Sequence, residues 1–300
     1  MPNRDQLLLT VLDRNPQIHL AYITHQPQRP ALHLHSAGFV MTTQLIVPLG
    51  LEHLHQIVHV TQPAGILRCP DHRAQATNPN QQCQDEPIKC GTQIQPAGKN
   101  WLGTAGAPVR WLDKGDTQRF GILSNWHVMA DGAEQIGHAQ HQPDTSKPAM
   151  ATLAEWSAVT CCQTMYVDAA IADAKMDGFH TIDDQIIGIG RLNPARLTAT
   201  EGLAVTKSGR TTSITNGRVV SVGAAVKVGY DGFTATFADQ IVIEGINGDF
   251  SAGGDSGSLV VDTEQHRPVG LLFAGGGGQT IANPIAKIMG MWDLDFALRE

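Results

Sequence analysis

One glycine-rich stretch contains the residue types that a nucleophilic serine requires. Residues Gly253–Gly257 place glycines around Asp255 and Ser256, and the segment Leu259–Val261 that follows is apolar and β-branched. Glycines can bend the backbone sharply enough to lift the Ser256 hydroxyl out of the chain, and a buried strand then fixes the bend. Consecutive N–H groups in such a turn can converge on one point, as an oxyanion hole requires. The alternative is a glycine-serine loop that closes a β-hairpin.

A base and a carboxylate that could serve this serine lie upstream. His127 follows an apolar strand candidate, where a histidine can also be a packed core residue. Asp168 is embedded in apolar sequence, and a buried carboxylate needs a partner such as an imidazole N–H. Asp173 and Asp177 are alternatives in more polar surroundings. With Ser256 these residues provide a hydroxyl, a base to take its proton, and a carboxylate to orient that base.

Read together, three segments resemble the motifs of the trypsin/chymotrypsin-like serine peptidases, in which the order is also His, Asp, Ser. These segments are Leu123–Val128, Asp168–Ala172 and Gly254–Val260. The likeness is closest to intracellular bacterial and plant members with L-S-N-x-H-V and G-D-S-G-S-L-V motifs, and Lys207–Thr212 also resembles that branch. It covers about residues 91 to 300.

The resemblance implies a double β-barrel with the active site in the cleft between the barrels. It implies catalytic roles for His127, Asp168 and Ser256, and an oxyanion hole formed by the N–H groups of Gly254 and Ser256. It also places Phe250 near the base of the primary specificity pocket. The wall of that pocket would be formed by Phe273, Ala274 and Gly275.

The surroundings of Asp255 and the absence of the expected disulfides depart from the secreted digestive members of that family. Their aspartate before the serine pairs with a new N-terminus released by cleavage, whereas Asp255 lies far from any obvious activation site. Either another group, with Lys207 and Arg210 as candidates, holds Asp255, or the oxyanion hole forms only on a signal. By the same resemblance, the position at the base of the specificity pocket is occupied by Phe250 and not by an acidic residue. The resemblance therefore implies a small or apolar residue before the scissile bond rather than a strict preference for lysine or arginine.

The elements that must position these residues are short strands separated by turn signals. We expect an all-β double antiparallel barrel over residues 96–300, with a C-terminal amphipathic helix over Ile285–Arg299 and a hairpin turn at Asn216–Gly217. A small α+β domain over residues 1–66 is expected to precede it, with strands at Ile18–Ile23, Ala31–His35, Phe39–Val47 and Ile57–Val60 and a short helix at Leu7–Leu12.

Residues 67–95 are predicted to be a linker or a zinc-binding segment. The four candidate zinc ligands are Cys69, His72, Cys83 and Cys90, and only the first two have a usual ligand spacing. The pairs His33 with His35 and His53 with His55 would each share one strand face. Metal ligation is one reading of those pairs, but surface histidines on a wet strand face are the commoner outcome and the one expected here.

Composition excludes several classes of function. The formal charge of −7 without a basic run argues against nucleic-acid binding, and no apolar run approaches membrane-spanning length. The N-terminal residues lack the layout of a signal peptide, and five cysteines without secretory context do not suggest a disulfide framework. These features predict a cytoplasmic protein.

The expected function is an intracellular serine endopeptidase that acts on a protein or peptide substrate through an acyl-enzyme, without a cofactor. The N-terminal region suits a regulatory partner, so the enzyme could be latent until a partner or processing activates it. One alternative is a catalytically idle module of the same fold that binds peptides or partner proteins. Another is a protease that cleaves only itself or one dedicated partner, with the first 90 residues as a docking or inhibitory domain.

Overall fold

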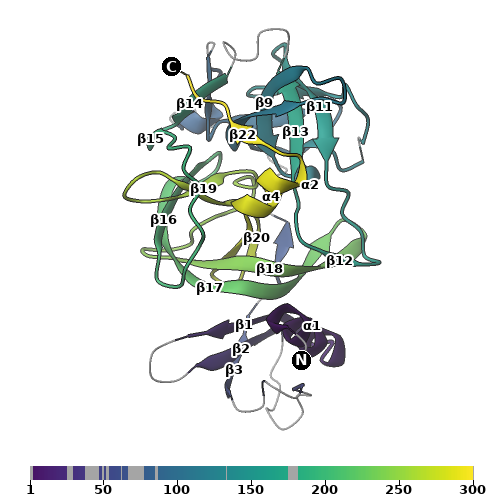
Figure 1. The fold of residues 1–300 in the computed structure, drawn as a ribbon, viewed down its shortest axis with the longest axis vertical. Coiled ribbons are helices and arrows are strands. Elements are labelled where there is room, and N and C mark those ends of the chain that lie inside the picture. Colours follow the sequence, from purple (N-terminus) through teal and green to yellow (C-terminus); the bar gives the residue numbers. More distant parts are fainter. Residues whose placement is uncertain are drawn as a thin grey trace.

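The computed structural model is built mainly of β-strands, arranged as two packed barrels with a smaller N-terminal unit beside them (Figure 1). None of the helices in the described ranges is both long and apolar enough to cross a bilayer. The structure describes residues 3–25, 30–37, 47–48, 51, 54–61, 63–66, 78–84, 87–132, 134–174 and 182–299.

The N-terminal unit begins with helix α1 (Arg4–Arg14). Asn3 and Gln6 form a capping box in which each side chain accepts a hydrogen bond from the other's backbone N–H. The helix packs against β1 (Ile18–Thr24) through its apolar side. Its fully buried residues are Leu8, Val11 and Leu12.

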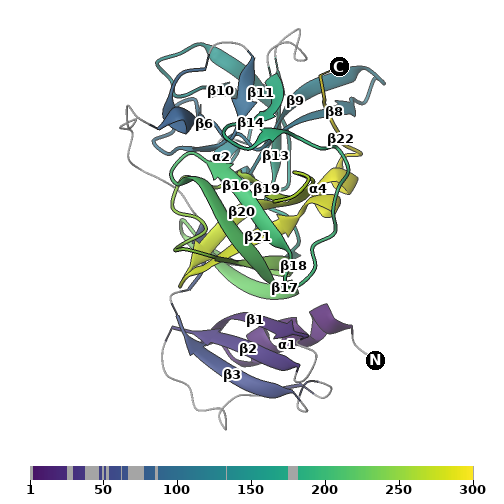
Figure 2. The same cartoon turned by 90° about the vertical axis from the view of Figure 1, so that its left-hand side faces the viewer.

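Three strands of this unit extend the sheet of the neighbouring barrel. Strand β1 pairs antiparallel with β2 (Ala31–Ser36), and β2 pairs parallel with β3 (His55–Val60). The other edge of β1 pairs antiparallel with β17 (Ser213–Tyr230), with Leu20 opposite Val226. Figure 2 shows β1, β2 and β3 lying below β17 and β18 (Phe233–Gly245). The helix and three of the four strands predicted in this region are present, while Phe39–Val47 lies, apart from Val47, outside the described residues.

The two histidines of β2 do not lie on a freely exposed face, because His35 is buried and His33 is half-buried. His35 is only 2% exposed, and its ring stacks on that of His59 with 4.4 Å between centroids. His33 Nδ1 lies 2.9 Å from His59 Nε2, and the His33 ring stacks on Tyr22. Pairing of β2 with β3 brings these rings together across neighbouring strands, which period-two spacing within one strand cannot indicate. His53 lies outside the described residues, as does the side chain of His55.

The first barrel contains a sheet of eight strands, and His127 and Asp168 lie next to the ends of two of them. Its strands are joined antiparallel around the path β22-β8-β9-β13-β11-β10-β6-β7. Their bounds are β6 (Gln93–Pro96), β7 (Gly103–Thr104), β8 (Ala107–Leu112), β9 (Gln118–Ser124), β10 (Ala139–His141), β11 (Ala149–Trp156), β13 (Ala170–Ala174) and β22 (Asp295–Phe296).

The second barrel belongs to a sheet of eleven strands that also includes β1–β3. This sheet includes the long hairpin formed by β17 and β18. The turn that contains Ser256 leads directly into another of its strands, β19. The remaining strands of this sheet are β4 (Gly65–Ile66), β12 (Thr164–Met165), β16 (Ala204–Gly209), β18 (Phe233–Gly245), β19 (Leu259–Asp262), β20 (Pro268–Gly276) and β21 (Gln279–Pro284). A third sheet joins β5 (Ile88–Cys90), β14 (Ile182–Ile186) and β15 (Gly190–Arg191).

The hairpin turn predicted at Asn216–Gly217 is wrong. Both residues lie inside β17, and the turn comes earlier, between Gly209 and Ser213, which face each other across β16 and β17. Gly217 is required for packing instead, since a Cβ there would meet Glu244 O and a ring carbon of Phe250 at 2.7 Å each. Close backbone approach, rather than a positive φ, explains this glycine.

The C-terminal helix is shorter than its apolar spacing predicts. Helix α4 spans Ile285–Met291, and Asp293 then takes a positive φ of 50° that ends it. Phe296 is not on the helix, because it lies in β22, where it pairs with Val109 of β8 and is buried. The chain end therefore crosses from the second barrel back to the first.

The described part of residues 67–95 packs against both barrels. Asn80 is buried and donates from its side chain to Gly91 O (2.7 Å) and Ser208 Oγ (2.8 Å). Asn78 donates to Arg210 O at 3.0 Å. Strand β5 joins the third sheet and β6 joins the first barrel. The division into an N-terminal domain, a connecting segment and a peptidase domain stays a prediction.

Candidate active site

The Ser256 turn is held by one residue of the first barrel. Gly254 and Gly257 have φ angles of 99° and 92°, a conformation that favours glycine. Thr104 donates from its N–H to the Ser256 carbonyl (2.8 Å) and from its hydroxyl to the Gly254 carbonyl (2.9 Å). A Cβ on Gly257 would meet Ser124 Oγ at 2.2 Å, so glycine lets the turn approach the end of β9. The sharp turn predicted from the glycines is present, and Thr104 fixes two of its peptide planes.

His127 lies in the single turn of helix α2 (Trp126–Met129), directly after β9 ends. Its side chain is fully buried. Asn125, at the start of the helix, donates from its side-chain amide to the Asp168 carbonyl at 2.8 Å. That bond ties the histidine turn to the loop that precedes β13, so the two segments hold a fixed separation.

Asp168 contacts His127 directly. His127 Nδ1–H donates to Asp168 Oδ2 at 2.7 Å, and the His127 backbone N–H donates to Oδ1 at 3.2 Å. The Asp168 N–H in turn donates to Asn283 Oδ1 at 2.9 Å. Both side chains are 0% exposed. A buried carboxylate is tolerated where it is paired and hydrogen-bonded, and Asp168 meets both conditions.

A third group at this carboxylate was not predicted from the sequence. The Tyr230 hydroxyl donates to Asp168 Oδ2 at 2.7 Å. Its ring stacks on Phe233 (5.1 Å) and lies edge-on to the His127 ring (6.2 Å). Tyr230 is at the end of β17, far along the chain from both partners, and no spacing rule connects it with them. Only the closure of the second barrel against the first brings it there.

The Ser256 hydroxyl donates to the Phe273 carbonyl of β20 at 3.2 Å. Ser256, His127 and Phe273 are all 0% exposed. The structure therefore brings His127 and Asp168 into contact and places Ser256 against β20, with the Ser256 turn packed on the end of the strand that precedes His127.

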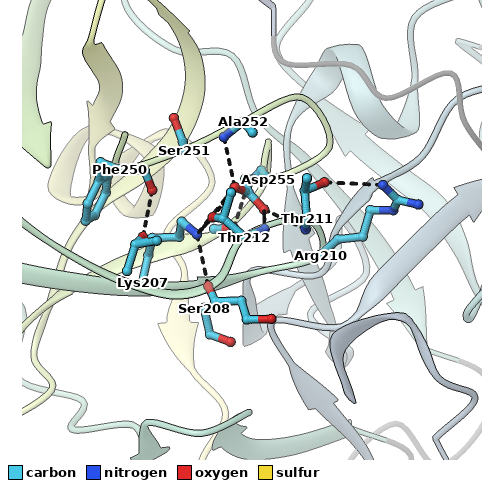
Figure 3. A network of polar contacts seen from close by, with 12 residues as sticks. Lys207, Ser208, Arg210, Thr211, Thr212, Phe250, Ser251, Ala252 and Asp255 are labelled. Carbon is cyan, nitrogen blue, oxygen red and sulfur yellow. Dashed lines mark hydrogen bonds and ion pairs between the residues drawn. The ribbon is translucent and has the colours of Figure 1, made fainter. Parts of the chain in front are cut away.

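Asp255, next to the serine, is surrounded by donors (Figure 3). Its Oδ1 accepts from the backbone N–H groups of Thr211 (2.8 Å) and Thr212 (3.1 Å). Its Oδ2 accepts from the Thr212 hydroxyl (2.6 Å) and from Ala252 N–H (3.0 Å). The turn between β16 and β17 thus wraps the carboxylate. Gly209 permits the approach, since a Cβ there would meet Asp255 Oδ1 at 2.6 Å.

Lys207 supplies the positive charge beside Asp255. Its Nζ lies 3.4 Å from Asp255 Oδ2, and both side chains are 0% exposed. Lys207 also donates to the Thr212 hydroxyl and, at 3.0 Å, to the Ser213 carbonyl. Burial lowers the pKa of Lys207, and the charge of Asp255 opposes that shift. Of the two cations proposed from the sequence, Lys207 contacts Asp255, whereas Arg210 donates to Gln93 Oε1 at 2.7 Å.

The residues predicted to form the specificity pocket lie in two places. Phe273, Ala274 and Gly275 are consecutive in β20 beside Ser256. Phe250 is 1% exposed, and its side chain packs in the apolar core of the second barrel with Val205 and Val219. Its carbonyl accepts from the Thr215 hydroxyl at 2.6 Å.

The other candidates lie apart from this cluster. Asp173 is half-buried on β13 and faces Arg119 at 3.5 Å, and Asp177 lies outside the described residues. Cys69 and His72 also lie outside them. Cys83 is exposed, while Cys90 is buried and donates to Asp183 O at 3.6 Å, and burial raises the pKa of its thiol. Within the described ranges no group of three or more histidine, cysteine or acidic residues is placed to hold a metal ion.

No family model and no curated protein matches the chain. Solved structures do resemble it. Thermobifida fusca protease A has a TM-score of 0.51 and 19% identity, covering 71% of this chain and 99% of that one. A Cellulomonas bogoriensis chymotrypsin has a TM-score of 0.50 and 20% identity, covering 70% of this chain and 97% of that one. Nocardiopsis protease has a TM-score of 0.50 and 16% identity, covering 70% of this chain and 98% of that one. The chain therefore has the double β-barrel fold of the chymotrypsin-like serine proteases.

Proposed function

We propose that the chain is a serine endopeptidase in which Ser256 is the nucleophile, His127 the general base and Asp168 the residue that orients the base. The observation that carries the proposal is the buried contact between His127 Nδ1 and Asp168 Oδ2 at 2.7 Å. That contact fixes the tautomer in which Nε2 is the basic nitrogen, and the carboxylate stabilises the imidazolium that forms.

The reaction starts when Ser256 exchanges its hydrogen bond to Phe273 O for one to His127 Nε2. Ser256 Oγ then attacks the substrate carbonyl as its proton passes to His127, and His127 gives that proton to the leaving amine. Water hydrolyses the resulting acyl-enzyme by the same proton path. The N–H groups of Gly254 and Ser256 bind the oxyanion, a role supported by the positive φ of Gly254 and the peptide planes that Thr104 holds.

Asp255 and Lys207 make this oxyanion hole independent of a released N-terminus. The carboxylate accepts four hydrogen bonds and faces a buried ammonium within the same domain. A turn held in this way needs no cleavage to form. Any latency of the enzyme then arises at the substrate site rather than at Asp255.

The substrate is a protein or peptide with a small or apolar residue before the scissile bond. Phe273, Ala274 and Gly275 flank that residue, and the buried ring of Phe250 leaves the pocket base without a charge. A cytoplasmic location and a regulatory partner of the N-terminal region belong to the same proposal. The free thiols of the four described cysteines support a reducing compartment.

Reaction with a small fluorophosphonate, followed by intact mass, tests the proposal on the full chain. We expect one adduct on the wild type and none on Ser256→Ala. Ser251→Ala is the matched control, because Ser251 lies in the same loop and its hydroxyl contacts Thr280 Oγ1 instead (2.6 Å). An adduct on Ser256→Ala would remove Ser256 as the nucleophile. The absence of an adduct on a folded chain whose substrate groove has been opened, as described below, would favour the idle peptide-binding module.

A further inference from the structure

The strand that passes the nucleophile is a template for peptide binding. Ser256 Oγ contacts the carbonyl of Phe273, and β20 continues from there through Ala274 and Gly275. A peptide added antiparallel to this strand, with its carboxyl end toward Phe273, brings a carbonyl to Ser256. Strand addition of this kind gives affinity through the main chain and is tolerant of sequence.

That position is already filled by β4. Ile66 lies opposite Ala274 and Gly65 opposite Gly275, in an antiparallel pair. The direction of β4 is therefore that of a substrate, because its residue numbers rise toward Phe273. An extended chain that continues this register past Ile66 would next face Phe273, the residue in contact with Ser256.

The opposite edge of β4 is paired as well. Gly65 lies opposite Gly229 of β17, and Gly229 N–H donates to the Ala64 carbonyl at 3.1 Å. The groove between β17 and β20 is thus closed by main-chain contacts on both sides. A Cβ on Gly65 would have Gly229 O as its nearest neighbour at 3.9 Å, so the groove has room for a residue with a side chain at this position.

Burial agrees with an occupied groove. Ile66 is half-buried and packs on the apolar cluster that contains Tyr230, Phe273 and Ala274. His127 and Ser256 are 0% exposed. A peptide cannot reach these residues along β20 while β4 is paired there.

The N-terminal unit keeps β4 at high local concentration. Strand β1 is hydrogen-bonded to β17, and the Tyr22 hydroxyl accepts from Gln279 Nε2 of β21 at 3.1 Å. Because the unit is docked and joined to β4 by the chain, re-entry of β4 is intramolecular and competes well with a dilute substrate.

From these contacts, and resting on the peptidase function proposed above, we propose that Gly65–Ile66 occupies the peptide-substrate groove of its own chain and inhibits it. The groove accepts extended peptides by adding a strand between β17 and β20. Activity then requires that β4 leave, while the residues around Ser256 are already in place.

Opening the groove in the full chain tests this inference. Ile66→Asp places a charge against the apolar cluster and disfavours docking of β4. Val58→Asp is the matched control, since Val58 is another half-buried β-branched residue of the N-terminal region that lies on β3, away from the groove. Gly65→Pro is a second variant, which removes a strand N–H without adding charge. Circular dichroism confirms that each variant is folded.

We expect Ile66→Asp and Gly65→Pro to raise kcat/KM for fluorescein-labelled casein by roughly tenfold or more, and Val58→Asp to match the wild type. Fluorophosphonate labelling of Ser256 should quicken in the same two variants. Labelling with wild-type rates in both folded variants would overturn the inference and leave the peptidase function standing. No labelling of any variant would overturn both.

Discussion

The molecule buries two carboxylates near the serine and holds them in different ways. Asp168 is bound by the groups of the proposed mechanism, because the His127 ring is one of its donors and Tyr230 is another. Asp255 is bound by backbone amides, a threonine hydroxyl and the Lys207 ammonium, none of which can take a proton from the serine. The first arrangement orients the proposed base, whereas the second fixes the shape of a turn. Changes at Asp168 should therefore act on rate, and changes at Asp255 on stability.

The largest expected effect is that of Asp168→Asn. The neutral amide no longer holds the productive tautomer of His127, so we expect kcat to fall by about 10³–10⁴-fold with little loss of stability. This fall is measured by introducing Asp168→Asn into the Ile66→Asp chain and comparing the rates of Ser256 labelling and of casein hydrolysis with and without it. Asp173→Asn, the same change at a half-buried site on β13, is the control. A fall of less than tenfold would remove Asp168 from the mechanism.

Lys207→Ala tests the other carboxylate. It leaves Asp255 buried without its cation, and we expect the free energy of unfolding to fall by about 3–5 kcal/mol. Lys207→Met, which keeps most of the side-chain volume, should cost less because it leaves a smaller cavity. Urea denaturation followed by tryptophan fluorescence gives both values, with the exposed Lys114→Ala as control. A loss under about 1 kcal/mol would mean that the amide and hydroxyl donors hold Asp255 without help.

His35 is a buried ionisable group that, among the residues the structure describes, has only other histidines as its charged neighbours, and it sharpens the comparison. Burial, followed by the nearby His59, His19 and His33, lowers the pKa of His35 from 6.5 to about 3. The unfolded chain thus binds more protons than the folded one between these values, so stability is full above pH 6.5 and is lost as the pH falls toward 3.

We expect the free energy of unfolding to fall by about 2 kcal/mol between pH 6.5 and 4.5 as a result of His35. His35→Phe, which keeps a ring in the stack, should flatten this slope, and the exposed His25→Phe should not. Urea denaturation at a series of pH values measures the slope. An unchanged slope in His35→Phe would show that His35 is not the group responsible for the loss of stability in acid.

The smallest effect is expected from Tyr230→Phe. Asp168 loses one donor but keeps both bonds from His127, so kcat should fall by roughly tenfold, the value of one hydrogen bond to a charged group. Tyr166→Phe, at an exposed tyrosine, is the control for the same change. Loss of activity as complete as in Asp168→Asn would show that Tyr230, rather than His127, fixes the carboxylate.

Much of the fold was predictable because its signals are local. The apolar cluster of α1, the apolar strands and the glycines of the Ser256 turn each act within a few residues. Local signals failed where packing overrode them. Asn216–Gly217 resembles a hairpin turn but lies in β17, and the spacing of Phe296 fits a helix although β8 pairs with it as a strand.

The sequence by itself determined the residue types of the proposed site: an imidazole, a carboxylate and a hydroxyl in the order His127, Asp168, Ser256, each beside a recognisable turn or strand. Tertiary structure alone decided which distant groups complete it. Tyr230 reaches Asp168, Lys207 rather than Arg210 faces Asp255, and β4 pairs with Ala274 and Gly275. These contacts join residues far apart in the chain, and their geometry depends on how the barrels close and on how β1 docks on β17. No pattern within one segment encodes such closure, because it results from the packing of all the strands together.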